Sequence, residues 1–239
     1  MFDRHKALNY PQNTRQSLWR YIPYERLLDL LKSKELFFTH VPKFSDALEG
    51  SLTGRSRDHL TSWFQRMNGS SNSTAIEEVK KYEEAQDEFY ASCWHMNNIE
   101  SYLMWKAYAE RGYAIRTTFE RLQASFDSFP GTVTGGTIDY IDFTRDTGPV
   151  GNVFHLVMTK DLPYSDEREF RLLFWKIDPI NANLQTTPMG IGIPVDISML
   201  IDTVFVNPIN PSVPGELLDL LEQYKIPMDG SSLKYRNTS

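Results

Sequence analysis

The sequence EREFRLLFW at positions 167–175 limits the fold of this chain more than any other segment. Its apolar residues Phe170, Leu172 and Phe174 recur at every second position, which is typical of a β-strand with one face in a hydrophobic core. The residues expected on the other face are Glu167, Glu169, Arg171 and Leu173. The segment therefore predicts a strand that carries two carboxylates and a guanidinium in one line opposite the core.

The rest of the chain predicts short strands and helices. Strands are expected at 17–23, 35–41, 88–94, 113–119, 132–143, 153–159, 203–206 and 232–236. Helices are expected at 24–33, 55–67, 75–88, 99–109 and 215–224. Because the strands occur in runs rather than in strict β-α-β alternation, we predict an α+β fold with a mixed, mainly antiparallel sheet and flanking helices.

The domain organisation follows from the absence of a clean linker and of an internal repeat. We expect residues 1–239 to form a single domain. The stretch at about 51–86 is unusually polar and contains the low-complexity run NGSSNST at 68–74. We interpret it as a solvated helical insertion, with a mobile loop at 68–74.

The net charge and the cysteine content limit which binding partners and which cellular compartment we expect. With 25 Lys and Arg against 31 Asp and Glu, the formal net charge is −6. A nucleic-acid partner is therefore not expected, although a local basic groove stays open. One cysteine excludes an intrachain disulfide and fits a reducing compartment. Without a long apolar stretch or a secretory signal, we expect a cytoplasmic protein with no membrane partner.

Familiar catalytic motifs are missing from the sequence. It contains no P-loop, no Rossmann glycine fingerprint and no G-x-S-x-G elbow. The five histidines show no H-x-x-x-H spacing, so no metal site is expected. Cys93 with His95 or His155 leaves a Cys–His nucleophile open, but a lone thiol beside Phe89 and Ala91 is more typical of packing.

The charged face of the segment at 167–175 has two interpretations. Glu169 or Glu167 can stabilise developing positive charge or accept a proton, with the carboxylate held by Arg171. Alternatively, these residues form an Arg–Glu ladder between adjacent strands, worth less than ~1 kcal/mol when exposed. Lys160 and Tyr164 either line the same pocket or lie at a solvated strand edge.

Arg20 is the second candidate. It shares a face with Leu18 and Ile22 in the first predicted strand, which is unusual for a guanidinium unless an anion or a carboxylate meets it. It either forms an ion pair with Glu49 or Glu169, or anchors a phosphate or carboxylate group of a ligand.

Several segments in order carry a family resemblance. They are LWRYIP, ELFFTHVPKFSDALEG, SCWH with YLMWKAYAERGYAIRTTF, DEREFR and IDTVFVNP. From about residue 18 to 233 the chain resembles the bacterial family named domain of unknown function 2971. The insertion at 51–86 and the pair Ala47-Leu48 depart from the family pattern, and the family has no established reaction.

The layout is also similar, more distantly, to the ADP-ribosyltransferase fold. That resemblance implies that Arg20 holds a dinucleotide and that Tyr90 or Trp94 flanks nicotinamide. It implies that Glu169 stabilises the oxocarbenium-like transition state and that Glu167 orients the acceptor. The residues that we assign to NAD binding are Arg20, Tyr21, Tyr90, Ser92, Trp94 and Arg171.

Two functions follow as expectations. The first is an NAD-dependent ADP-ribosyltransferase or NAD glycohydrolase that acts as a toxin or phage-defence effector, with NAD as substrate and a small molecule or protein as acceptor. The second is a non-catalytic binding module that recognises a small anionic ligand or a protein partner in the same cleft.

Overall fold

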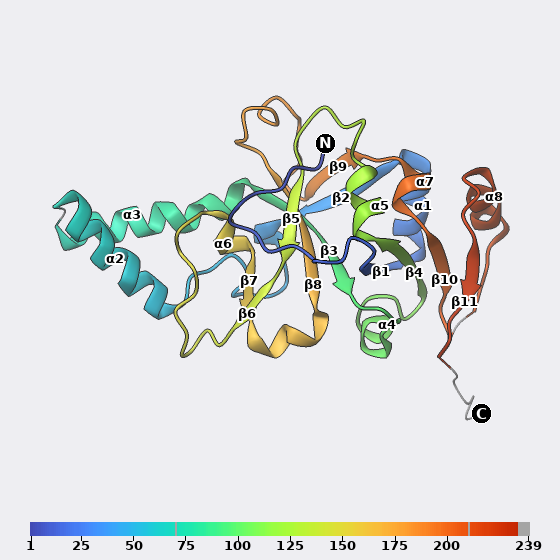
Figure 1. The fold of residues 1–239 in the computed structure, drawn as a ribbon, viewed down its shortest axis with the longest axis horizontal. Helices are drawn as coiled ribbons and strands as arrows, with labels where there is room; N and C mark the ends of the chain where they lie inside the picture. The colour runs from blue at the N-terminus through green and yellow to red at the C-terminus, as the bar shows by residue number, and fades with distance from the viewer. Residues whose placement is uncertain (70, 210, 234–239) are drawn as a thin grey trace.

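A computed structural model describes residues 1–69, 71–209 and 211–233 (Figure 1). The fold is α+β, with a large, mostly antiparallel sheet and flanking helices, as the sequence predicts. The strands are β1 (Ser17–Pro23), β2 (Glu35–His40), β3 (Phe89–Met96), β4 (Gly112–Thr118), β5 (Thr134–Thr137), β6 (Asp139–Ile141), β7 (Thr159–Asp161), β8 (Glu169–Trp175), β9 (Gly190–Pro194), β10 (Thr203–Val206) and β11 (Met228–Gly230). The helices are α1 (Tyr24–Ser33), α2 (Gly54–Asn68), α3 (Asn72–Glu84), α4 (Tyr102–Tyr108), α5 (Phe119–Ala124), α6 (Phe154–Val157), α7 (Ile197–Leu200) and α8 (Gly215–Gln223), with short 3₁₀ helices η1 (Val41–Lys43), η2 (Ala85–Glu88) and η3 (Leu162–Glu167).

Within the described residues the main sheet has nine strands, in the order β11-β10-β4-β1-β3-β2-β9, with β8 paired to β3 and β5 paired to β8. All these pairs are antiparallel except β10 with β11. The strands β6 and β7 form a small parallel sheet of their own. Strand β8 covers only the part of the predicted strand that begins at Glu169, because Glu167 belongs to η3.

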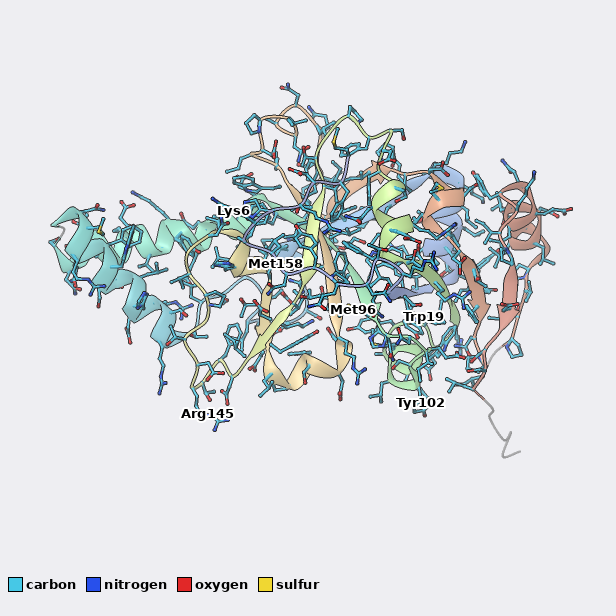
Figure 2. All side chains as sticks on the ribbon, viewed as in Figure 1. Lys6, Trp19, Met96, Tyr102, Arg145 and Met158 are labelled. Atoms are coloured by element: carbon cyan, nitrogen blue, oxygen red, sulfur yellow. The ribbon has the colours of Figure 1, made fainter. Side chains whose placement is uncertain are left out.

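The sheet has a notch beside β3, and this notch shapes the candidate site. One edge of β3 pairs with β8 along Phe89–His95. The other edge of β3 is shared by two strands. Strand β1 pairs only with the last two residues of β3, and β2 pairs only with Tyr90 and Ala91. Trp19 of β1 and Met96 of β3 are labelled in Figure 2. Residues 92–94 therefore have no ladder partner on that edge.

The two faces of the sheet are covered differently. Helices α1, α5, α7 and α8 pack on one face over the main core, which includes Leu18, Trp94, Leu172 and Phe174. The other face carries two smaller cores, one around Phe89 and Leu173 with α6, and one around Trp19 and Trp105 with α4. The cavity described below is lined by members of both smaller cores.

The helices α2 and α3 pack against each other and extend away from the sheet, at the left of Figure 1. Buried Leu60 and Val79 anchor them in the core around Phe89. The loop expected at 68–74 is shorter than predicted, because α3 begins at Asn72. Ser71 caps that helix by accepting a hydrogen bond from the Thr74 amide, and such caps favour helix over loop.

Three other expectations for local structure need correction. The segment 153–159 is not a strand: its first part is α6, and only Thr159 enters β7. A short apolar run does not distinguish a buried helix from a buried strand. The helix expected at 99–109 is shorter, because Ser101 caps α4. The last strand of the described residues is Met228–Gly230; Ser232 and Leu233 are not in a strand, and the rest of the strand expected at 232–236 lies outside the described residues. No helix in the described ranges is both long and apolar enough to cross a bilayer.

Candidate functional site

A cavity of about 450 Å³ lies at the notch, on the face of the sheet that carries α4. This volume is within the range of small-molecule sites, roughly 300–1,000 Å³. Its lining residues are Trp19, Arg20, Tyr21, Ile22, Thr39, Lys43, Phe44, Ser45, Asp46, Glu49, Ala91, Cys93, Trp94, His95, Met104, Tyr108, Lys160, Tyr164, Glu167 and Glu169. Folding thus gathers the first strand, the loop after β2, the middle of β3 and the turn before β8 around one hollow.

The structure brings together most of the predicted site residues. Arg20, Tyr21, Trp94, Glu167 and Glu169 all line the cavity. Lys160 and Tyr164, whose place the sequence left open, line it as well.

Glu169 and Arg171 form the buried base of the site. They lie on the same face of β8, opposite His95 and Cys93 of β3. Arg171 Nε donates to Glu169 Oε1 at 2.5 Å, and Arg171 Nη2 donates to Glu169 Oε2 at 2.9 Å. Burial opposes ionisation of Glu169, but the facing Arg171 and Lys160 outweigh it and lower the pKa of that carboxyl. The Arg–Glu ladder expected between adjacent strands is not formed by this pair, because Arg171 bonds Glu169 within one strand and both residues are buried.

Glu49 joins the same guanidinium from a distant loop. Its Oε1 accepts from Arg171 Nη1 at 2.5 Å, across 122 positions of sequence. Gly50 adopts a φ of +73°, and a Cβ at this position would meet the side chain of Gln86. The turn that presents Glu49 to Arg171 therefore requires glycine.

Lys160 lies among three carboxylates. Its Nζ is 2.6 Å from Glu167 Oε2, 3.6 Å from Glu169 Oε2 and 3.7 Å from Glu49 Oε2. Burial alone lowers the pKa of this ammonium, but the carboxylates outweigh burial and raise it. We call Glu49, Glu167, Glu169, Lys160 and Arg171 the charged cluster. Three formal negative charges against two positive ones leave the cluster with a net charge of −1.

Glu167 reaches the cavity from a turn rather than from the strand. Its Oε1 accepts from the Tyr108 hydroxyl at 2.6 Å, and its Oε2 accepts from Lys160. Arg168 adopts a left-handed φ of +41° between the two glutamates. This turn explains how Glu167 and Glu169 both line the cavity although only Glu169 is in β8. Burial and the Glu167 carboxylate raise the pKa of Tyr108, so its hydroxyl stays a donor.

Arg20 lies in the notch, on the side of the cavity formed by β1 and β2. It donates to Ser92 Oγ, donates to the Phe37 carbonyl at 3.4 Å, and lies 5.7 Å from the Trp94 ring centroid. Neither Glu49 nor Glu169 pairs with it, and no other described carboxylate does. Burial lowers the pKa of this guanidinium to about 10, so it remains a cation near neutral pH.

Three of the residues assigned to NAD binding, Tyr90, Ser92 and Arg171, do not line the cavity. Tyr90 packs in the main core against Phe174 and does not line the cavity. Ser92 is buried and accepts from Arg20. Arg171 is fully buried and donates hydrogen bonds to Glu169 and Glu49. Tyr90 and Ser92 lie on the main-core face of β3, whereas Cys93 and His95 line the cavity from the other face. Trp94 belongs to the main core and lines the cavity as well.

Several cavity residues were missed as site residues. Lys43 comes from η1, Asp46 from the loop that follows it and Tyr108 from α4, and only their long-range placement reveals them. Cys93 does lie in the wall, but burial and the nearby Glu169 raise the pKa of its thiol well above the usual range. This favours the packing role over a Cys–His nucleophile.

Unpaired polar atoms are concentrated at this cavity. In the described part of the chain, eight buried side-chain atoms have no hydrogen-bond partner, and four of them belong to lining residues: Asp46 Oδ2, Glu49 Oε2, Trp94 Nε1 and His95 Nε2. Buried polar groups normally have partners, because an unpaired one costs roughly 1–3 kcal/mol. Three acceptors and one donor lack a hydrogen-bond partner here, although Glu49 Oε2 is in ion-pair distance of Lys160. Such atoms match a ligand rich in hydroxyl or N–H groups.

No set of three or more His, Cys, Asp or Glu side chains within the described residues is arranged to hold a metal ion. Comparisons of the chain with models of protein families, with curated proteins and with solved structures give no match. The function of the cavity therefore rests on its own geometry and chemistry.

Proposed function

We propose that this protein is an NAD-consuming enzyme, similar to the ADP-ribosyltransferases, which binds NAD in the cavity and breaks the bond between nicotinamide and ribose. One observation carries the proposal. Arg20, a cation without a carboxylate partner among the described residues, and the charged cluster with its net negative charge lie on the walls of one cavity.

The charges of the cavity match those of the substrate. The oxidised nicotinamide ring is positive and the diphosphate is negative, so the ligand needs an acidic region and a basic region at a distance from each other. Arg20 and the exposed Lys43 supply the basic region. Guanidinium groups bind phosphate oxygens through charge-assisted hydrogen bonds, which are stronger than neutral ones.

The reaction that we propose separates charge at the ribose. The C1–N bond breaks with its electron pair going to nicotinamide, and positive charge develops on the sugar ring. Glu169 and Glu167 stabilise that charge from positions fixed by Arg171, Lys160 and Tyr108. The oxygen of water or of an acceptor hydroxyl then forms a bond to C1 and loses its proton.

The sequence supports the proposal through the order of Arg20, Trp94 and the Glu167–Glu169 turn, which resembles the ADP-ribosyltransferase pattern. The longer resemblance to domain of unknown function 2971 makes a bacterial, cytoplasmic effector, a toxin or a phage-defence protein, the setting that we propose. The acceptor is then a small molecule or a protein.

A non-catalytic binding module is the second candidate, and one observation favours it. Both oxygens of Glu169 already accept hydrogen bonds from Arg171, which reduces the charge available to a transition state. In that case the cavity recognises an anionic ligand at Arg20 without changing it.

The test measures NAD binding by calorimetry and nicotinamide release by chromatography. We expect release by the wild-type protein, and a loss of at least about 100-fold for Glu169→Gln and for Glu167→Gln with affinity changed only a few-fold. Glu77→Gln, on the exposed surface of α3, is the matched control. Binding without release would favour the binding module, and the absence of both would refute the proposal.

A further inference from the structure

His95 occupies a central position in the site. It lies opposite Trp19 across the ladder between β1 and β3, and opposite Glu169 across the ladder between β3 and β8. The residue is only 3% exposed, yet it lines the cavity.

The hydrogen bond on one side of the ring fixes its tautomer. His95 Nδ1 lies 2.6 Å from the carbonyl oxygen of Glu167. A carbonyl only accepts, so Nδ1 carries the proton and Nε2 of the neutral ring presents a lone pair. Burial lowers the pKa of His95, which favours this neutral form.

The other side of the ring has no partner. Nε2 is buried and forms no hydrogen bond with any described residue. A ring held by an Nδ1–H to a backbone carbonyl, with a bare Nε2, has the arrangement that general bases use. The surrounding titratable and charged groups are Glu167, Arg168, Glu169, Tyr21 and Cys93.

We infer that His95 Nε2 accepts the proton of the hydroxyl that attacks the ribose, and so acts as the general base of the site. The inference rests on the proposed function. As the oxygen–C1 bond forms and the C1–nicotinamide bond breaks, the hydroxyl proton moves to Nε2 and later leaves to solvent. Water or an acceptor hydroxyl serves equally well as the donor.

The first measurement does not require turnover. In ¹⁵N-labelled wild-type protein, two-bond proton–nitrogen correlations report which ring nitrogen of each histidine carries the proton. We expect His95 to be protonated at Nδ1, and its Nε2 resonance to shift when ADP-ribose is added. The opposite tautomer, or an Nε2 resonance that saturating ADP-ribose leaves unchanged, would overturn the assignment.

The second measurement separates binding from chemistry. His95→Asn keeps an N–H donor near the Glu167 carbonyl but removes Nε2. We expect kcat to fall at least about 100-fold with KM changed less than threefold, because general bases contribute roughly 10²–10⁴-fold. His155→Asn, whose side chain lies outside this cavity, is the control and keeps full turnover.

The two proposals fail in different ways. If the wild-type protein neither binds nor cleaves NAD, both are overturned. If it cleaves NAD and His95→Asn is equally fast, only the role of His95 is overturned. Should His95→Asn not fold, the spectrum of the wild-type protein still decides the question.

Discussion

The guanidinium of Arg171 holds both carboxylate oxygens of Glu169 from a position two residues along the same strand. The same guanidinium also bonds Glu49, which reaches it from the loop after β2. Glu49 and Glu169, two of the three glutamates that line the cavity, are therefore fixed by a residue that does not line it. A buried cation in this position sets the geometry of the acidic region and lowers the pKa of Glu169.

Removal of Arg171 should destabilise the protein strongly. Arg171→Met leaves Glu169 and Glu49 without their main counter-charge, and breaking a buried pair on one side costs about 3–5 kcal/mol of unfolding free energy. Urea unfolding followed by circular dichroism measures the loss. Arg57→Met, which removes the more exposed pair with Glu83, should cost less than about 1 kcal/mol. Equal effects of the two substitutions would contradict the assignment of Arg171 as the buried support.

The lowered pKa of His95 predicts a pH dependence of stability. Below about pH 6.5 the histidine of the unfolded chain binds a proton, whereas burial disfavours protonation of the folded one. The unfolded state then binds more protons, so the unfolding free energy contributed by His95 falls as the pH falls from about 7 towards 5.5. His95→Asn should flatten this part of the curve measured by urea unfolding, and His59→Asn on the exposed surface of α2 should not. A steeper curve for His95→Asn would show that the sign is wrong.

The sequence predicted which strands carry the site better than it predicted which of their side chains face the cavity. Alternation along β8 placed Glu169 and Arg171 together opposite the main core, because charged and apolar residues alternate along the strand although both of its faces are buried. Strand β3 is largely buried on both faces, so its alternation separates Tyr90 and Trp94 from Cys93 and His95 without showing that Trp94, Cys93 and His95 line the cavity and Tyr90 does not.

The partners that come from distant segments were not predictable. Nothing in the local pattern connects Glu49 with Arg171, since their contact depends on how the loop after β2 folds back. The notch is a similar case. It arises because β1 and β2 share one edge of β3, and such sharing is a property of the sheet rather than of any strand.

Cys93 should be unreactive in the folded protein. Burial and the neighbouring Glu169 raise the pKa of its thiol, so little of the nucleophilic thiolate exists near neutral pH. We expect labelling by Ellman's reagent to be slow in buffer and fast in urea, and we expect Cys93→Ala to retain NAD turnover if the proposed function holds. Rapid labelling of the native protein would contradict the raised pKa of the thiol.

Arg20 should contribute to ligand binding much more than to stability. Its guanidinium bonds only Ser92 and the Phe37 carbonyl and forms no ion pair with a described carboxylate. Arg20→Gln therefore removes a partly buried cation at little cost, and we expect a change in unfolding free energy below about 1 kcal/mol. Loss of a charge-assisted bond to phosphate is worth about 1.5–3 kcal/mol, so the Kd for ADP-ribose should rise roughly 10- to 150-fold. Calorimetry and urea unfolding on the same samples give both quantities.

Arg26→Gln is the control because it removes an exposed guanidinium that lines the smaller neighbouring cavity and not this one. A large loss of stability with unchanged affinity would show that Arg20 is part of the architecture, and the basic region of the site would then have to be sought at Lys43.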